Sequence, residues 1–153
     1  MRMTPARLIK ALLGGIASAL IVATSLWLHM RLGFAAELLG APRAGSPTLI
    51  YTPVLFALEA LRASWPLALP MVVLSALSGP WPIRAITLLV LAGGWYWAAD
   101  RLTIGFAADF NAYWLPGEAF SQTFFDPILT PVLLIGALVA QAALLKWLNH
   151  QPT

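Results

Sequence analysis

Residues 11–30 read ALLGGIASALIVATSLWLHM and contain no Asp, Glu, Lys or Arg. An α-helix rises about 1.5 Å per residue, so this run extends about 30 Å, the thickness of the hydrocarbon core of a bilayer. Arg2, Arg7 and Lys10 precede it. A cleaved signal peptide also combines a basic start with an apolar run, but its apolar core is only about 7–15 residues long. The stretch therefore predicts a retained transmembrane helix.

The composition of the whole chain indicates the same class of protein. Of its 153 residues, 60% are hydrophobic and 10% are charged, whereas soluble domains carry about 25% charged residues. So few charges cannot cover a surface that faces water, but a surface that faces lipid needs none. We therefore expect an all-α integral membrane protein that folds as one domain over residues 1–153, with the lipid bilayer around it.

Several classes of function are disfavoured by composition and motifs. The chain has no cysteine, which excludes disulfides, thiolate metal sites and cysteine nucleophiles. Its formal net charge is +3, but the basic residues are scattered singly, so nucleic acid is not an expected partner. The sequence contains no phosphate-binding loop, dinucleotide fingerprint, nucleophile elbow or zinc-protease motif. No metal and no cofactor is implied, and an enzyme is the less favoured class.

Further apolar stretches complete an expected bundle of about four transmembrane helices. The second span carries Pro66 and Pro70, which remove backbone donors and predict a kink. Whether residues 50–65 cross the membrane or lie on it stays open, because Glu59 and Arg62 interrupt an otherwise apolar segment. The expected spans are residues 11–30, 57–79, 83–102 and 127–147.

The distribution of charge predicts how these helices are oriented. Four spans place both termini on one side, and the charged residues expected there are all basic: Arg2, Arg7, Lys10, Arg84 and Lys146. All the acidic residues fall on the other side. Cytoplasmic loops carry the excess of Lys and Arg, so we expect cytoplasmic termini in a bacterial inner membrane. The outer loops are then residues 31–56 and 103–126.

The second outer loop is rich in acidic and aromatic residues. Asp126 precedes Pro127 and the last span, which is the position of a helix N-cap. The middle of the loop contains Trp114 and Glu118 among several phenylalanines. Its acids are expected to solvate and cap the loop. Its aromatic residues favour contact with the membrane surface or with a partner.

The candidate functional residues are polar side chains near the membrane, where ionisable groups often mark sites. Glu59 and Arg62 are neighbours on a helix and are expected to pair locally. Asp100 and Arg101 follow the aromatic residues 95–97, so we expect them at the interface, where Arg101 can pair with Glu59 or Glu118. Gln141, in the last span, is expected to form a hydrogen bond across helices. The candidate partner or pathway residues are Glu59, Arg62, Asp100, Arg101, Trp114, Glu118 and Gln141.

Small residues recur at four-residue spacing along the expected spans. Such faces let helices approach closely. The pattern fits packing inside this protein and also fits docking against a partner subunit. The pairs are Gly14/Ser18, Gly15/Ala19, Ser75/Gly79 and Gly136/Ala140.

Three functions stay open. The first is a non-enzymatic accessory or assembly subunit of a larger inner-membrane complex, or a homo-oligomer, which docks through its helix faces and its outer aromatic loop. The second is a small oligomeric transporter or channel, with the four charged candidates of the second and third spans along its path. The third is a lipid-processing enzyme that acts at the outer face through Asp109, Glu118 and Arg101.

Overall fold

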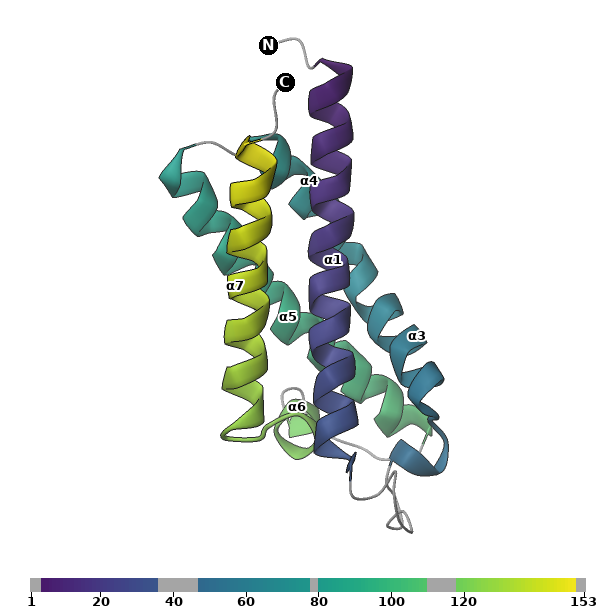
Figure 1. Cartoon of the computed structure of the whole chain (residues 1–153). Coiled ribbons are helices and arrows are strands. Elements are labelled where there is room, and N and C mark those ends of the chain that lie inside the picture. Colours follow the sequence, from purple (N-terminus) through teal and green to yellow (C-terminus); the bar gives the residue numbers. More distant parts are fainter. Residues whose placement is uncertain (1–3, 36–46, 78–79, 110–117, 151–153) are drawn as a thin grey trace.

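The computed structural model describes residues 4–35, 47–77, 80–109 and 118–150, and every regular element in these ranges is helical (Figure 1). The expected all-α class is therefore confirmed. In chain order the elements are α1 (Pro5–Gly33), the 3-10 helix η1 (Pro47–Leu49), α3 (Pro53–Ser64), the 3-10 helix η2 (Trp65–Leu67), α4 (Ala68–Ala76), α5 (Trp81–Asp109), α6 (Glu118–Thr123) and α7 (Leu129–His150).

Three helical segments in the described part of the chain are long and apolar enough to cross a membrane: Pro5–Gly33, Pro53–Ala76 and Leu129–His150. These segments fit an integral, multi-pass membrane protein. The helix α5 has 29 residues and extends beyond the expected end at residue 102. Its aromatic residues 95–97 and the adjacent Asp100 and Arg101 make it less apolar than the other three.

The second candidate span consists of three consecutive helical pieces. Its first piece, α3, begins at Pro53, and the Oγ1 of Thr52 caps it by accepting the N–H of Leu55 at 3.3 Å. Pro66 lies in the first turn of η2, where the N–H that proline lacks would have no partner within that helix. Most of residues 50–65 therefore belong to a candidate span of 24 residues. The kink itself stays a prediction.

The central helix of the bundle is α1. It contacts α3, η2, α4, α5 and α7, and 50% of its most apolar window is buried, against 22% for Pro53–Ala76 and 17% for Leu129–His150. Gly14 and Gly15 allow it to approach α4 closely, since a Cβ on Gly15 would lie 2.6 Å from the backbone oxygen of Ala68. The small-residue face at these glycines thus packs inside the protein.

A series of hydrogen bonds ties α1 to α5 and α7 in the interior. The indole N–H of Trp95 on α5 donates to Ser25 Oγ at 2.9 Å, and the Ser25 hydroxyl donates to the carbonyl of Leu133 on α7 at 3.1 Å. Trp95 is the largest fully buried side chain among the described residues, and a buried indole requires such an acceptor. These bonds fix three helices against one another.

Near the end of α1, His29 holds the segment that precedes α7. Its Nε2 lies 3.0 Å from Thr130 Oγ1, and the Thr130 hydroxyl donates to the carbonyl of Phe124 at 2.5 Å. The ring of His29 also packs against the ring of Phe124, with 4.8 Å between the centroids. The connection between α6 and α7 is thereby fastened to α1.

The helices place both ends of the described chain at the same end of the bundle. Figure 1 shows that α1 and α7 run antiparallel, so the start of α1 lies beside the end of α7. The helix α6 and the start of α3 lie at the opposite end, which we call the loop end. The helix α5 runs obliquely from the first end towards the loop end.

Asp126 caps α7, as its position before Pro127 predicts. Its Oδ1 accepts the backbone N–H groups of Ile128 at 2.8 Å and Leu129 at 2.6 Å. Hydrogen bonds to the ionised form favour that form. The bonds from Leu129 and Ile128 therefore lower the pKa of the Asp126 carboxyl from its usual value.

We expect Asp126→Ala to lower the thermal stability of the detergent-solubilised protein at neutral pH, and the difference from wild type to disappear in strong acid. Because the pKa is lower in the folded state, the stabilisation is complete above the unfolded-state pKa and is lost as the pH falls through the folded-state value. Thermal unfolding at a series of pH values measures it, with Ser121→Ala as a control that has no ionisable group. A stability difference that stays constant down to the lowest pH would contradict the assignment.

Candidate functional site

A cleft of about 390 Å³ lies between α3 and α5. Its polar lining consists of Tyr51, Glu59, Arg62 and Arg101, and its apolar walls include Trp97. Three of the candidates chosen from the sequence, Glu59, Arg62 and Arg101, thus meet in one place. They come from two helices, because α3 and α5 pack against each other.

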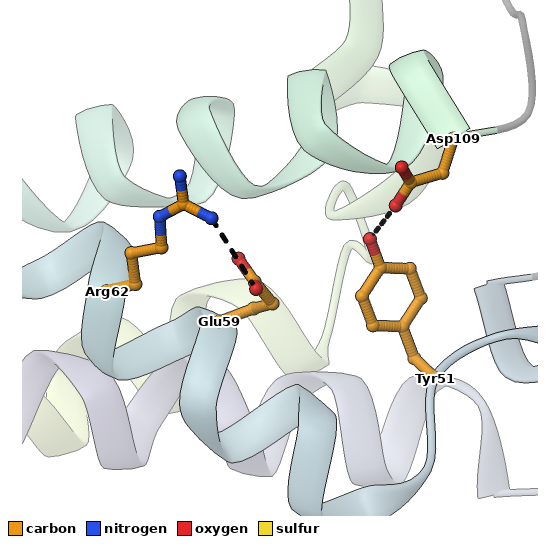
Figure 2. A network of polar contacts seen from close by, with 4 residues as sticks. All are labelled: Tyr51, Glu59, Arg62 and Asp109. Atoms are coloured by element: carbon orange, nitrogen blue, oxygen red, sulfur yellow. Dashed lines mark hydrogen bonds and ion pairs between the residues drawn. The ribbon is translucent and has the colours of Figure 1, made fainter.

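Glu59 and Arg62 form the expected local pair (Figure 2), with 3.9 Å between Arg62 Nη1 and Glu59 Oε1. The side chain of Arg62 is 83% exposed and that of Glu59 is 39% exposed. A long and exposed pair of this kind contributes only about 0–1 kcal/mol. A guanidinium carries five N–H donors, so Arg62 retains donors for a further partner.

Tyr51 connects the start of α3 to the end of α5. Its hydroxyl donates a hydrogen bond to Oδ2 of Asp109 (Figure 2), and its ring packs against Phe106 with 4.6 Å between centroids. Burial, followed by the hydrogen bond to Asp109 and the charge of that carboxylate, raises the pKa of Tyr51. Tyr51 therefore stays protonated at physiological pH and remains a donor to Asp109.

Arg101 lies over Trp97, with 5.1 Å between its guanidinium carbon and the centroid of the ring. This is a cation–π contact, which leaves the charge of the guanidinium unneutralised. Arg101 forms no ion pair with any residue whose position the structure describes. Arg101 thus turns towards the aromatic wall and not towards Glu59 or Glu118, the two partners that the sequence left open.

The other candidates lie away from the cleft. Asp100 is not part of its lining, and its buried Oδ1 has no hydrogen-bond partner among the described residues. Gln141 is fully buried on α7, and neither polar atom of its side chain has a partner, so the expected bond across helices is not formed. Glu118 begins α6 and is exposed. Trp114 lies outside the described residues.

A second hollow, which we call the α1/α7 groove, has a volume of about 430 Å³ and is lined by apolar and small residues. Ala17 and Thr24 line it from α1, and Gly136 and Ala140 line it from α7. A Cβ placed on Gly136 would meet no atom within 4 Å. Unlike Gly14 and Gly15, the small-residue pair Gly136/Ala140 is thus left open by the rest of the chain.

No protein-family model, curated protein or solved structure matches this chain. Within the described ranges, no group of three His, Asp or Glu side chains lies close enough together to hold a metal ion.

Tyr51 and Trp97, whose side chains give the cleft a hydroxyl and an aromatic wall, were not among the candidates chosen from the sequence. Tyr51 immediately precedes Thr52 and Pro53, which together are a recognisable helix start, so its place beside α3 was predictable. Its contact with Asp109 was not, because that depends on how α3 packs against α5. Trp97 belongs to the aromatic residues 95–97, which predict a position at the membrane interface but do not indicate that one of them lines a cleft.

Proposed function

We propose that the protein is a four-span accessory or assembly subunit of a larger inner-membrane complex. In this proposal, a transmembrane helix of a neighbouring subunit packs into the α1/α7 groove. The termini lie in the cytoplasm, and the loop end, which includes the α3/α5 cleft, lies on the outer side of the membrane.

The observation that carries the docking proposal is the open surface at Gly136. Where this chain packs α1 against α4, the space at Gly14 and Gly15 is filled by side chains and backbone of α4. Gly136 has the same small-residue spacing with Ala140 but meets nothing. Without side chains in the way, a second helix can approach closely and gain van der Waals contacts, which drive helix association in lipid.

The length and direction of α5 support four crossings. A helix of 29 residues extends about 43 Å, which exceeds the hydrocarbon core of about 30 Å. Arg84 lies near its first end, and Arg101 and Asp109 lie near its second end. Charges at both ends with an apolar middle fit a helix whose ends reach the two interfaces.

The carboxylates of the cleft support a role without catalysis. Asp109, which lies beside the cleft and not in its lining, accepts the Tyr51 hydroxyl, and Glu59 makes a long, exposed contact with Arg62. A lipid-processing enzyme would need a carboxylate positioned against a substrate. A transport path along all four charged candidates is also less favoured, because Asp100 does not line the cleft with the others.

The test compares two substitutions at open glycines. We expect Gly136→Leu to remove the partner from the protein purified from native membranes in mild detergent, because leucine fills the groove where the partner helix would pack. Gly93→Leu is the matched control, since Gly93 on α5 also meets nothing within 4 Å but does not line the groove. Native mass measurements follow both variants, and copies with two different tags show whether the partner is a second copy. A wild-type protein that remains a bare monomer, or equal loss of partner in both variants, would contradict the proposal.

A further inference from the structure

We propose that the α3/α5 cleft binds the headgroup of a phospholipid that carries both a phosphate and a primary amine, as phosphatidylethanolamine does. The phosphate lies between Arg62 and Arg101, and the ammonium group lies against Glu59. This inference does not depend on the docking proposal, because the cleft and the α1/α7 groove are separate surfaces.

The two arginines supply the phosphate site. Both line the cleft. Among the residues that the structure describes, Arg62 makes one ion pair, the exposed contact of 3.9 Å to Glu59, and Arg101 lies over the face of Trp97 without an ion pair. The planar guanidinium presents two parallel N–H groups that match the oxygens of a phosphate. The cleft has two guanidinium groups and one carboxylate in its lining, so it carries an excess of positive charge until an anion binds.

Glu59 supplies the selectivity for an amine. It faces the same cleft and is partly exposed. A carboxylate is an acceptor only, so it binds a primary ammonium through N–H donors. The quaternary ammonium of a choline headgroup has no N–H to donate, and a glycerol headgroup has no positive charge to offset the carboxylate. Both should therefore bind more weakly at this position.

The depth of the cleft matches the headgroup region. Measured along the helix axis from Pro53, the first residue of α3, Glu59 lies about 9 Å and Arg62 about 14 Å into the helix. The exposed Trp65 is the first residue of η2 and lies about one turn deeper than Arg62, and Trp97 lies one turn deeper than Arg101 on α5. Tryptophan concentrates at the membrane interface, so charged side chains one turn further out lie among the lipid phosphates.

The experiment measures lipid retention by the whole purified protein with native mass spectrometry. Phosphatidylethanolamine, phosphatidylcholine and phosphatidylglycerol with identical acyl chains are added separately. We expect phosphatidylethanolamine to be retained most strongly. We expect Arg101→Gln to weaken its retention about tenfold, as the loss of one charge-assisted bidentate contact implies, and Arg62→Gln to weaken it in the same direction. Arg84→Gln is the matched control, because Arg84 is an exposed arginine on the same helix as Arg101, near the opposite end of α5. This variant should leave lipid retention unchanged.

Glu59→Gln tests the amine part of the inference. This variant should lose the preference for phosphatidylethanolamine over phosphatidylcholine while it keeps its binding of phosphatidylcholine. Soluble glycerophosphoethanolamine, added in excess, should not displace the lipid, since the apolar wall of the cleft also holds the lipid near its glycerol. Displacement would mean that a soluble phosphate ester is the ligand and would overturn the lipid assignment. Equal retention of the three lipids, stronger retention of phosphatidylglycerol, or equal effects of Arg101→Gln and Arg84→Gln would overturn the site.

Discussion

Gly15→Ala is expected to destabilise the folded protein by about 1–3 kcal/mol, the usual cost of overpacking a filled interior. The added Cβ would lie 2.6 Å from the carbonyl oxygen of Ala68 and 2.9 Å from the backbone nitrogen of Val72. Both are backbone atoms, so no rotation of a side chain can make room for the methyl group. The helices α1 and α4 would have to separate, and α1 is the helix on which the other spans pack.

The control for this prediction is Gly93→Ala on α5, where the added Cβ meets no atom within 4 Å. Alanine is a better helix former than glycine by about 1 kcal/mol, so Gly93→Ala should be neutral or stabilising. The same chemical change should therefore destabilise the protein at Gly15 but not at Gly93. Unfolding by increasing fractions of SDS in mixed micelles, followed by circular dichroism, measures both. Equal stability of the two variants would contradict the close approach of α1 to α4.

Local features of the fold could be predicted from the sequence because they depend on neighbours along one helix. Asp126 caps α7 through the N–H groups two and three residues ahead, and Glu59 meets Arg62 one turn away. The apolar runs likewise predict the helical class, since length and hydropathy alone decide whether a segment suits the membrane. None of these features depends on which helices pack against one another.

Features that depend on packing between helices could not be predicted in the same way. Gly15/Ala19 and Gly136/Ala140 have the same spacing, yet Gly15 is filled by α4 and Gly136 is open. Arg101 faces a cleft with Glu59 and Arg62, whereas its neighbour Asp100 does not. Such differences arise from how the helices are rotated and packed against one another, which local patterns along one helix do not determine.

We propose that four helices cross the membrane with both termini in the cytoplasm, so that the α3/α5 cleft faces outward. The crossing that distinguishes four spans from three is that of α5, which is less apolar than the other three segments. If α5 crosses, Trp81 at its start and Ser121 on α6 lie on opposite sides of the membrane. If α5 lies on the surface, both residues lie on the same side.

Labelling of single cysteines by a membrane-impermeant maleimide in spheroplasts tests this claim most directly. The chain has no cysteine of its own, and Thr4, Trp81 and Ser121 are all exposed, so Thr4→Cys, Trp81→Cys and Ser121→Cys each report one position against no background. We expect Ser121→Cys to react in intact spheroplasts, and Thr4→Cys and Trp81→Cys to react only after the membrane is permeabilised. Reaction of Trp81→Cys and Ser121→Cys from the same side would contradict it.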